Sequence, residues 1–264
     1  MSYILLGGTV LILALTLLLV RSWTERSGQI AEAAVSPEAP AERPVEKATE
    51  TEPAAVVSAR GAEESRPETL PNVAIVIDDV GNSLEELAPF LKLPIPVTFA
   101  VMPLRVHTAE SVKRIQAAGK SYIMHQPMEA EGGANPGEGA IYSGMRRDEI
   151  YRLLEENIAS LGRGVTGMNN HMGSRVTADA ETMGYVLDFL NEKGMFFLDS
   201  LTTGESVAGT LAKARGLPYL ERNSMFLDNN REREYIERAL RSGFEIAGQS
   251  GRAVMIGHVW DQHL

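Results

Sequence analysis

The sequence contains no cysteine, and this absence excludes disulfide bonds and thiol catalysis without identifying the compartment. An excess of basic residues is absent as well. The formal net charge is −10 at pH 7, and so acidic a chain is a poor match for the phosphate backbone of nucleic acids. The chain has 264 residues, of which 44% are hydrophobic and 23% charged. These proportions are typical of a globular protein.

Charge is also missing from the first part of the chain. Residues 3 to 20 form an uncharged run of 18 residues that ends at Arg21, long enough to cross a hydrocarbon core of ~30 Å. A cleaved signal peptide is the alternative, but no basic segment precedes the run and no small-x-small site follows it directly. We therefore expect residues 1–21 to be a transmembrane anchor. Arg21 and Arg26 weakly favour a cytoplasmic C-terminal part, but Glu25 and Glu32 dilute that signal, so charge leaves the orientation open.

Residues 22–70 are rich in Ala, Glu and Pro, and Trp23 is their only aromatic residue. Such a segment has too little apolar surface to offset the entropy lost on ordering. We predict a disordered linker over this range.

Residues 71–264 are long enough for one folded domain with a full core. Short β-branched or aromatic runs alternate in this part with longer amphipathic runs, which predicts βα units and a parallel sheet. About seven strands favour a barrel-like α/β fold over an open sheet. The predicted helices lie at 83–93, 108–118, 146–161, 178–194, 206–216 and 231–251. The predicted strands lie at 73–77, 97–103, 121–127, 195–200, within 217–228 and from 253 on, with a strand end or loop at 164–173.

Polar residues follow the predicted strands at their carboxyl ends, the edge at which parallel α/β folds build their sites. Each one alone has an ordinary structural explanation, because an aspartate after a strand commonly caps a helix or closes a turn. Six such residues at one edge favour a functional site. They are Asp78, Asp79, His125, His171, Asp199 and His258.

Imidazoles beside a carboxylate are ligands suited to Zn²⁺ or a similar divalent metal. A bound metal lowers the pKa of its water towards ~7. A second carboxylate can then accept a proton from that water, and a further histidine can protonate a leaving group. The adjacent Asp78 and Asp79 could divide the roles of base and ligand, because neighbouring side chains of a strand point in different directions.

The motifs IDDVGN, PVTFAVMP, MHQPMEA, GMNNHMGSRVTAD, FFLDSLTT and MIGHVW together resemble the divergent polysaccharide deacetylase family, a relative of the NodB-type carbohydrate esterases. The resemblance spans about residues 72 to 261. It implies a distorted (β/α) barrel of about seven parallel strands and metal-assisted deacetylation of an N- or O-acetylated sugar. It also implies a site of action outside the cytoplasm of a bacterium. Together with the anchor expected at residues 1–21, this predicts a periplasmic domain anchored to the membrane.

The resemblance also implies individual roles. Asp78 resembles the catalytic base, His258 the catalytic acid, and Asp199 the acid that usually orients the base. Asp79 and His125 resemble metal ligands. The family's usual second histidine, four residues after the first, is replaced here by Glu129, so His171 becomes the expected third ligand and Glu129 a reserve.

Three further residues near these motifs are possible substrate contacts. Arg175 could pair with Asp78 or with the substrate. Asn169 and Asn170 could donate to a substrate carbonyl, although holding the backbone of their loop is the favoured interpretation.

Three functions remain open at this point. The first is a membrane-anchored, metal-dependent deacetylase of a cell-envelope glycan, which we favour. The second is a metal-containing but inactive domain that binds a glycan or an envelope protein, and the third is a structural anchor whose site residues are relics. The sequence identifies neither the sugar nor a protein partner.

Overall fold

The computed structural model describes residues 70–259. The predicted anchor, the linker and the last five residues lie outside this range. No helix within it has the length and apolar composition needed to span a bilayer.

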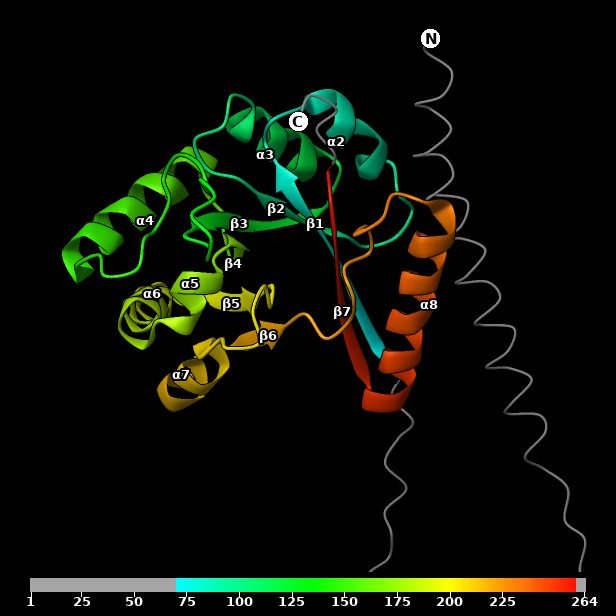
Figure 1. The fold of residues 1–264 in the computed structure, drawn as a ribbon. Coiled ribbons are helices and arrows are strands. Elements are labelled where there is room, and N and C mark those ends of the chain that lie inside the picture. The colour runs from blue at the N-terminus through cyan, green and yellow to red at the C-terminus, as the bar shows by residue number, and fades with distance from the viewer. Residues whose placement is uncertain (1–69, 260–264) are drawn as a thin grey trace, which may run out of the picture. The chain divides into compact units, whose positions relative to one another are not determined.

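Strands and helices alternate along the described chain (Figure 1), as the sequence predicts. The strands are β1 (Asn72–Val80), β2 (Thr98–Val101), β3 (Ser121–Met128), β4 (Gly167–Met172), β5 (Phe196–Asp199), β6 (Tyr219–Glu221) and β7 (Arg252–His258). The helices are α2 (Leu84–Leu91), α3 (Thr108–Ala117), α4 (Arg147–Leu161), α5 (Ser174–Ala178), α6 (Ala180–Lys193), α7 (Ala208–Arg215) and α8 (Arg233–Ser250).

All seven strands form one parallel sheet in the order β6-β5-β4-β3-β2-β1-β7. The sheet curls into a nearly closed barrel with the helices on its outside (Figure 1). The predicted α/β class, with seven parallel strands in a barrel-like sheet, is therefore confirmed for the described residues. Residues 164–173, predicted as a strand end or loop, contain a regular strand, β4, which pairs with β3 and β5.

Strand alternation separates two apolar layers, because successive side chains of a strand point to opposite faces. The smaller layer fills the inside of the barrel. The larger one packs the outer faces of the strands against the helices, with Phe99, Met124 and Phe197 fully buried. The inner layer consists of Val76, Ala100, Ile123, Leu198, Val254 and Ile256.

Local sequence signals explain where several helices begin and end. The Ser83 side chain accepts a hydrogen bond from the Glu86 amide at the start of α2, and Asp179 accepts from Glu181 and Thr182 at the start of α6. Helix α6 ends at Gly194, which adopts the left-handed conformation that glycine allows at low cost.

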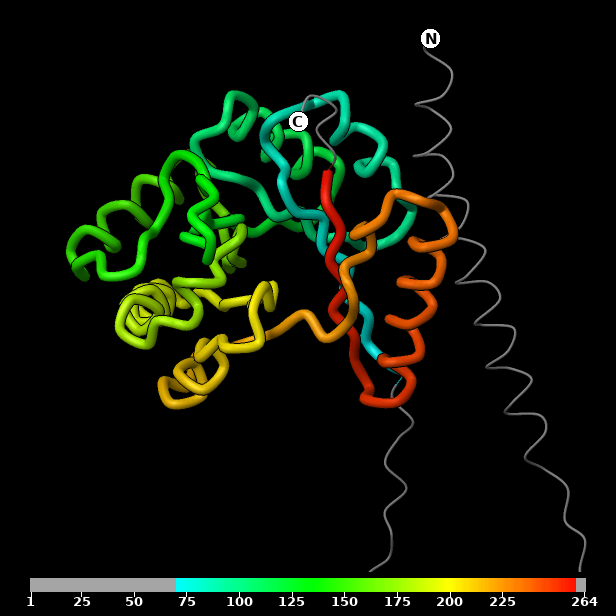
Figure 2. Tube along the Cα trace, viewed as in Figure 1, coloured from blue at the N-terminus to red at the C-terminus, as the bar shows by residue number. Residues whose placement is uncertain are grey.

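The barrel has a seam, because no pairing between β6 and β7 is present among the described strands. The chain leaving β6 crosses this seam and runs beside β7 before it enters α8 (Figure 2). We call residues 222–228 the seam segment. Its Asn223 side chain accepts a hydrogen bond from the Val254 amide at 2.8 Å and donates to the Arg252 carbonyl at 3.1 Å.

The seam segment continues this edge pairing towards the end of β7. The Ser224 hydroxyl donates to the Val254 carbonyl at 3.0 Å, and the Leu227 amide donates to the Ile256 carbonyl at 2.8 Å. Two side chains and one backbone amide of the seam segment thus take the place of a neighbouring strand along much of this edge.

Candidate metal centre

The inner apolar layer ends below a ring of polar side chains at the carboxyl edge of the barrel. Strand alternation produces this arrangement, because residues two positions apart point to the same face. The inward-facing pairs are Val76 and Asp78, Ile123 and His125, Asn169 and His171, Leu198 and Ser200, and Ile256 and His258.

Asp79 joins this group although it follows an inward-facing aspartate directly. It has a positive φ of 63°, and the register between β1 and β2 shifts between Ile77 and Val80. A positive φ is uncommon for a residue with a side chain, and aspartate tolerates it better than most. The local irregularity lets two consecutive carboxylates face one site.

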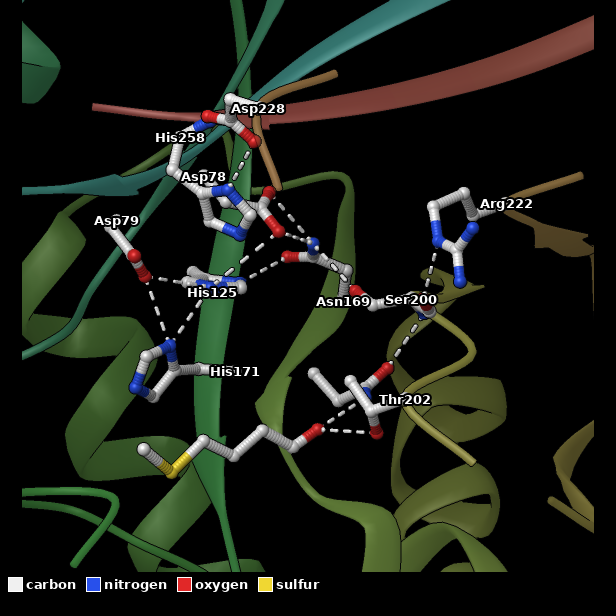
Figure 3. A network of polar contacts seen from close by, with 12 residues as sticks. Asp78, Asp79, His125, Asn169, His171, Ser200, Thr202, Arg222, Asp228 and His258 are labelled. Carbon is white, nitrogen blue, oxygen red and sulfur yellow. Dashed lines mark hydrogen bonds and ion pairs between the residues drawn. The ribbon is translucent and has the colours of Figure 1, made fainter. Parts of the chain in front are cut away.

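Three side-chain atoms converge at the edge of β1, β3 and β4 (Figure 3). Asp79 Oδ1 lies 2.9 Å from His171 Nδ1 and 3.2 Å from His125 Nε2, and these two nitrogens lie 3.3 Å apart. The atoms therefore form a nearly equilateral triangle.

This triangle fits a divalent metal such as zinc. Ligand bonds of about 2.0–2.2 Å in tetrahedral geometry place neighbouring ligand atoms about 3.3–3.6 Å apart, so only a slight expansion is needed. Asp79 Oδ1 is buried, and no hydrogen bond of acceptable geometry reaches it among the described residues. Three protein ligands leave a coordination position open, which is typical of catalytic rather than structural zinc sites.

The charges at this centre also favour a cation. Burial opposes ionisation of Asp79, but the adjacent His125 and His171 rings more than offset it and hold the pKa of Asp79 well below its usual range. Burial opposes protonation of His125, yet Asp78 and Asp79 outweigh it and raise the pKa of that ring. The two carboxylates thus draw positive charge to His125, and a metal would compete with its proton.

Asp78 lies beside the triangle and is 1% exposed. Its Oδ2 is 3.6 Å from His125 Nε2, and both carboxylate oxygens accept from Asn169 Nδ2, at 2.9 and 3.1 Å. Burial raises the pKa of Asp78, although His125 and His258 act in the opposite direction. A carboxylate with a raised pKa is a stronger base than an exposed one.

His258 completes the group and is oriented by Asp228 from the seam segment. Asp228 Oδ1 is 2.9 Å from His258 Nδ1, and Oδ2 accepts from the His258 amide at 2.6 Å. Burial opposes protonation of His258, but the hydrogen bond and charge of Asp228, with the charges of Asp78 and Asp79, raise its pKa to about 9. The ring is therefore protonated at neutral pH, as a general acid must be.

Arg222 connects the seam segment to the rest of the site (Figure 3). Its guanidinium donates to the Ser200 and Leu201 carbonyls, each at 2.9 Å, and to the Ser224 carbonyl. The same group lies 4.1 Å from the centre of the Phe226 ring, which packs at 5.4 Å from the His258 ring. Arg222 thus ties the end of β5 to the segment that carries Asp228.

The predicted role of Asp199 in orienting the base has no support in these contacts. Asp199 follows Leu198 directly and therefore points to the outer face of the sheet, where its carboxylate accepts from the Ser206 hydroxyl at 2.6 Å, the Leu201 amide at 2.8 Å and the Tyr219 hydroxyl at 3.3 Å. Asn169 contacts Asp78 in its place. The alternation of side chains along β5 (Phe196–Asp199, FFLD) predicts this, because Leu198 points to the inner face and its neighbour Asp199 must point to the outer one.

Glu129 and Arg175 pair with each other outside the triangle. Arg175 Nη1 is 3.4 Å from Glu129 Oε1, and Glu129 Oε2 accepts from the Ser143 amide at 2.9 Å. The possible pairing of Arg175 with Asp78 is therefore wrong, and His171 rather than Glu129 lies with the other two candidate ligands.

The two asparagines before His171 differ in their contacts. Asn170 donates to the Met172 carbonyl at 2.7 Å and accepts from the Ser200 amide at 2.9 Å, which agrees with the favoured backbone-holding role. That role is wrong for Asn169, which contacts Asp78, His125 and Ser200. The sequence patterns do not predict the role of Asp228, because only the path of the seam segment brings it to His258.

Residues 75–264 match the family described as divergent polysaccharide deacetylase. The chain belongs to this family. The resemblance noted in the sequence motifs is thereby confirmed, and the match covers all the residues of the ring at the carboxyl edge.

Two relatives extend the comparison. An uncharacterized protein from Haemophilus influenzae is 35% identical over 186 residues, which are 70% of this chain and 66% of that protein. The uncharacterized protein YibQ from Escherichia coli K12 is 29% identical over 194 residues, 74% of this chain and 60% of YibQ. The match therefore spans slightly less than two thirds of each relative.

A solved structure supports the fold. The crystal structure of an uncharacterized protein from Agrobacterium tumefaciens C58 superposes with a TM-score of 0.67 and 24% identity, covering 72% of this chain and 78% of the other.

Proposed function

We propose that this protein is a metal-dependent deacetylase that hydrolyses an acetyl group from a glycan of the bacterial cell envelope. The observation that carries the proposal is the triangle formed by Asp79, His125 and His171, with a carboxylate of raised pKa and an oriented histidine of raised pKa beside it. Family membership supports the substrate class.

A divalent metal, most simply zinc, would supply a water of lowered pKa and polarise the acetyl carbonyl. Asp78 accepts a proton from the attacking water, whose oxygen bonds to the carbonyl carbon. The bond from that carbon to the sugar nitrogen or oxygen then breaks. His258 donates its proton to the departing amine or alcohol, while Asp228 holds the ring in place. The products are acetate and the deacetylated sugar.

The proposed location is the periplasm. Its support is the uncharged run at residues 3–20, followed by a linker long enough to extend the domain away from a membrane. A fusion of a reporter enzyme that is active only outside the cytoplasm, placed after residue 70, would test this. Activity of the reporter is expected, and an inactive reporter would contradict the periplasmic location.

A second candidate is a metal-containing domain that binds a glycan or an envelope protein without turnover. The observation in its favour is the burial of Asp78, whose carboxylate oxygens both already accept from Asn169. If Asp78 cannot approach the attacking water, hydrolysis does not occur, and the domain can only bind its ligand.

The deciding experiment measures bound metal and acetate release for the full chain and for Asp78→Ala. Chitooligosaccharides and peptidoglycan fragments are the substrates. One zinc per chain in both proteins, with acetate released only by the wild type, would support the deacetylase. Zinc in both proteins with no acetate from either would favour the binding domain. A wild type without metal would contradict both.

A further inference from the structure

Asn169 occupies the centre of the site on the inward face of β4 and is fully buried (Figure 3). Its Nδ2 donates to Asp78 at 2.9 and 3.1 Å and lies 3.2 Å from the Ser200 hydroxyl. Its Oδ1 lies 2.8 Å from His125 Nδ1. One amide group therefore contacts both the proposed base and a candidate metal ligand.

The orientation of this amide is forced by its neighbours. Rotation by 180° would turn Oδ1 towards the Asp78 carboxylate and place two acceptors against each other. The same rotation would also place the Asn169 amide NH2 group against the N–H of His125 Nδ1 whenever that nitrogen carries its proton, so two donors would face each other. In the observed orientation the carboxylate receives a donor, and the ring nitrogen meets an acceptor.

This orientation determines which nitrogen of His125 is free to bind a metal. The Asn169 oxygen can only accept, so His125 Nδ1 must carry the proton that it accepts. Nε2 is then the nitrogen left for the ligand triangle, where it lies 3.2 Å from Asp79 Oδ1. Hydrogen-bond partners behind ligating histidines commonly fix the tautomer and ring orientation in this way.

We infer that Asn169 is a positioning residue that holds Nε2 of His125 towards the metal and holds the Asp78 carboxylate beside it. The part that concerns Asp78 rests on the proposed function, because a positioned base matters only for turnover. The part that concerns His125 requires only that the triangle binds a metal. The two measurements below therefore test the part that concerns His125, and they stay decisive if the protein shows no turnover.

Asn169→Leu keeps a similar side-chain volume and removes every hydrogen bond of the amide. The matched control is Asn157→Leu, which removes another buried amide, one that donates to Gln126 Oε1 and to the Gly139 carbonyl at 2.8 Å each. Both exchanges lower stability, but only Asn169 contacts the candidate centre. Asn169→Ala is a second variant with less steric risk.

Zinc affinity is measured by competition with a chelator in proteins whose cooperative unfolding has been verified. Loss of a hydrogen-bond partner behind a ligand typically weakens metal binding about 10–100-fold. We expect a loss of this size for both Asn169 variants and less than about 3-fold for Asn157→Leu. Unchanged zinc affinity in a folded Asn169 variant would overturn the inference, as would failure of both variants to fold with zinc present.

A second readout is the exchange of the His125 Nδ1 proton with water, followed by nitrogen-labelled histidine spectra of the zinc-loaded protein. Slow exchange is expected in the wild type and in Asn157→Leu, with fast exchange in both Asn169 variants. Equal rates in all proteins would overturn the inference. If the wild type binds zinc but releases no acetate, the proposed function fails while these two measurements still decide the role of Asn169 towards His125.

Discussion

The two sides of the barrel build their parts of the site differently. On one side, β1, β2, β3 and β4 pair with one another in that order, and the polar residues continue the inward-facing rows of these strands, apart from Asp79 with its positive φ. At the seam between β6 and β7, a non-regular segment supplies Asp228, and side chains replace strand pairing. The paired side holds the candidate metal ligands, and the seam holds the proposed acid.

The side chains on the two sides are therefore held in position by different interactions. Ligands on the paired side are positioned by backbone hydrogen bonds that most substitutions leave intact. His258 depends in addition on specific side chains of the seam segment, above all Asp228 and Arg222. Loss of a candidate ligand on the paired side should therefore remove the metal, whereas damage to the seam should leave the metal and impair proton transfer.

The largest effect is expected on the paired side, for His171→Ala. Removing one of three candidate ligands should abolish stoichiometric zinc and lower acetate release by ~10³-fold, since a metal supplies several kcal/mol of transition-state stabilisation. Metal analysis and an acetate assay measure this. His107→Ala is the control, because His107 is not among the three converging ligands. Full zinc content in His171→Ala would contradict the ligand assignment.

A smaller effect is expected at the seam, for Asp228→Asn. The exchange removes the carboxylate charge that helps raise the pKa of His258 to about 9. The acid must be protonated, so the alkaline limb of kcat/KM should move to lower pH by about 1–2 units, with zinc content unchanged. A pH profile from 6 to 10 measures the shift. An unchanged alkaline limb would exclude the Asp228–His258 pair as its origin.

The same pair makes stability depend on pH. The folded-state pKa of His258 lies above its ordinary value of 6.5, so its stabilising contribution is complete below about pH 6.5 and is lost as pH rises through about 9. Denaturant unfolding of the wild type should show this decline. In Asp228→Asn, the free energy of unfolding should change less with pH over the same range. An equal decline in both proteins would mean that groups other than the Asp228–His258 pair cause it.

A third effect concerns the connection between the two sides. Arg222→Ala removes donors to three backbone carbonyls and should lower the free energy of unfolding by about 2–3 kcal/mol. Acetate release should fall about 10-fold while zinc remains bound. The control is Arg152→Ala, which removes an exposed pair with Glu156 and should change stability by less than about 0.5 kcal/mol. Equal stability of the two variants would contradict the connecting role.

The smallest effect on turnover is expected for Asp199→Asn. The carboxylate lies on the outer face, so the exchange should cost about 1–2 kcal/mol of stability through its hydrogen bonds and lower turnover only a few-fold. A loss comparable to that of Asp78→Ala would instead support the catalytic role that the family resemblance implies for Asp199.

Sequence patterns predict the paired side well for a physical reason. The alternation of inward and outward side chains within β1 and β3 depends only on neighbouring residues. The strand-like runs that lead to Asp78 and His125 can therefore be recognised in the sequence. The conformation of Asp79 is not, because nothing in IDDVGN alone indicates its positive φ. The position of Asp199 at a strand end does not by itself show which face of the sheet its side chain points to.

The seam could not be predicted in the same way. Asp228 lies 30 residues before His258, and the hydrogen bond between them depends on where the non-regular segment crosses. No periodicity marks such a crossing. The sequence indicates Asn169 but not its role. A buried asparagine can hydrogen-bond the backbone of a loop or position side chains of a site, and only the contacts with neighbouring strands distinguish the two.

The side chains along β7 have a consequence beyond the site. An unpaired strand edge recruits strands from other molecules and promotes aggregation. Asn223, Ser224 and Asp228 already occupy polar groups along this edge, so the segment that carries Asp228 should also protect the chain from intermolecular pairing. We therefore expect substitutions in the seam segment to lower solubility during folding as well as to impair the chemistry.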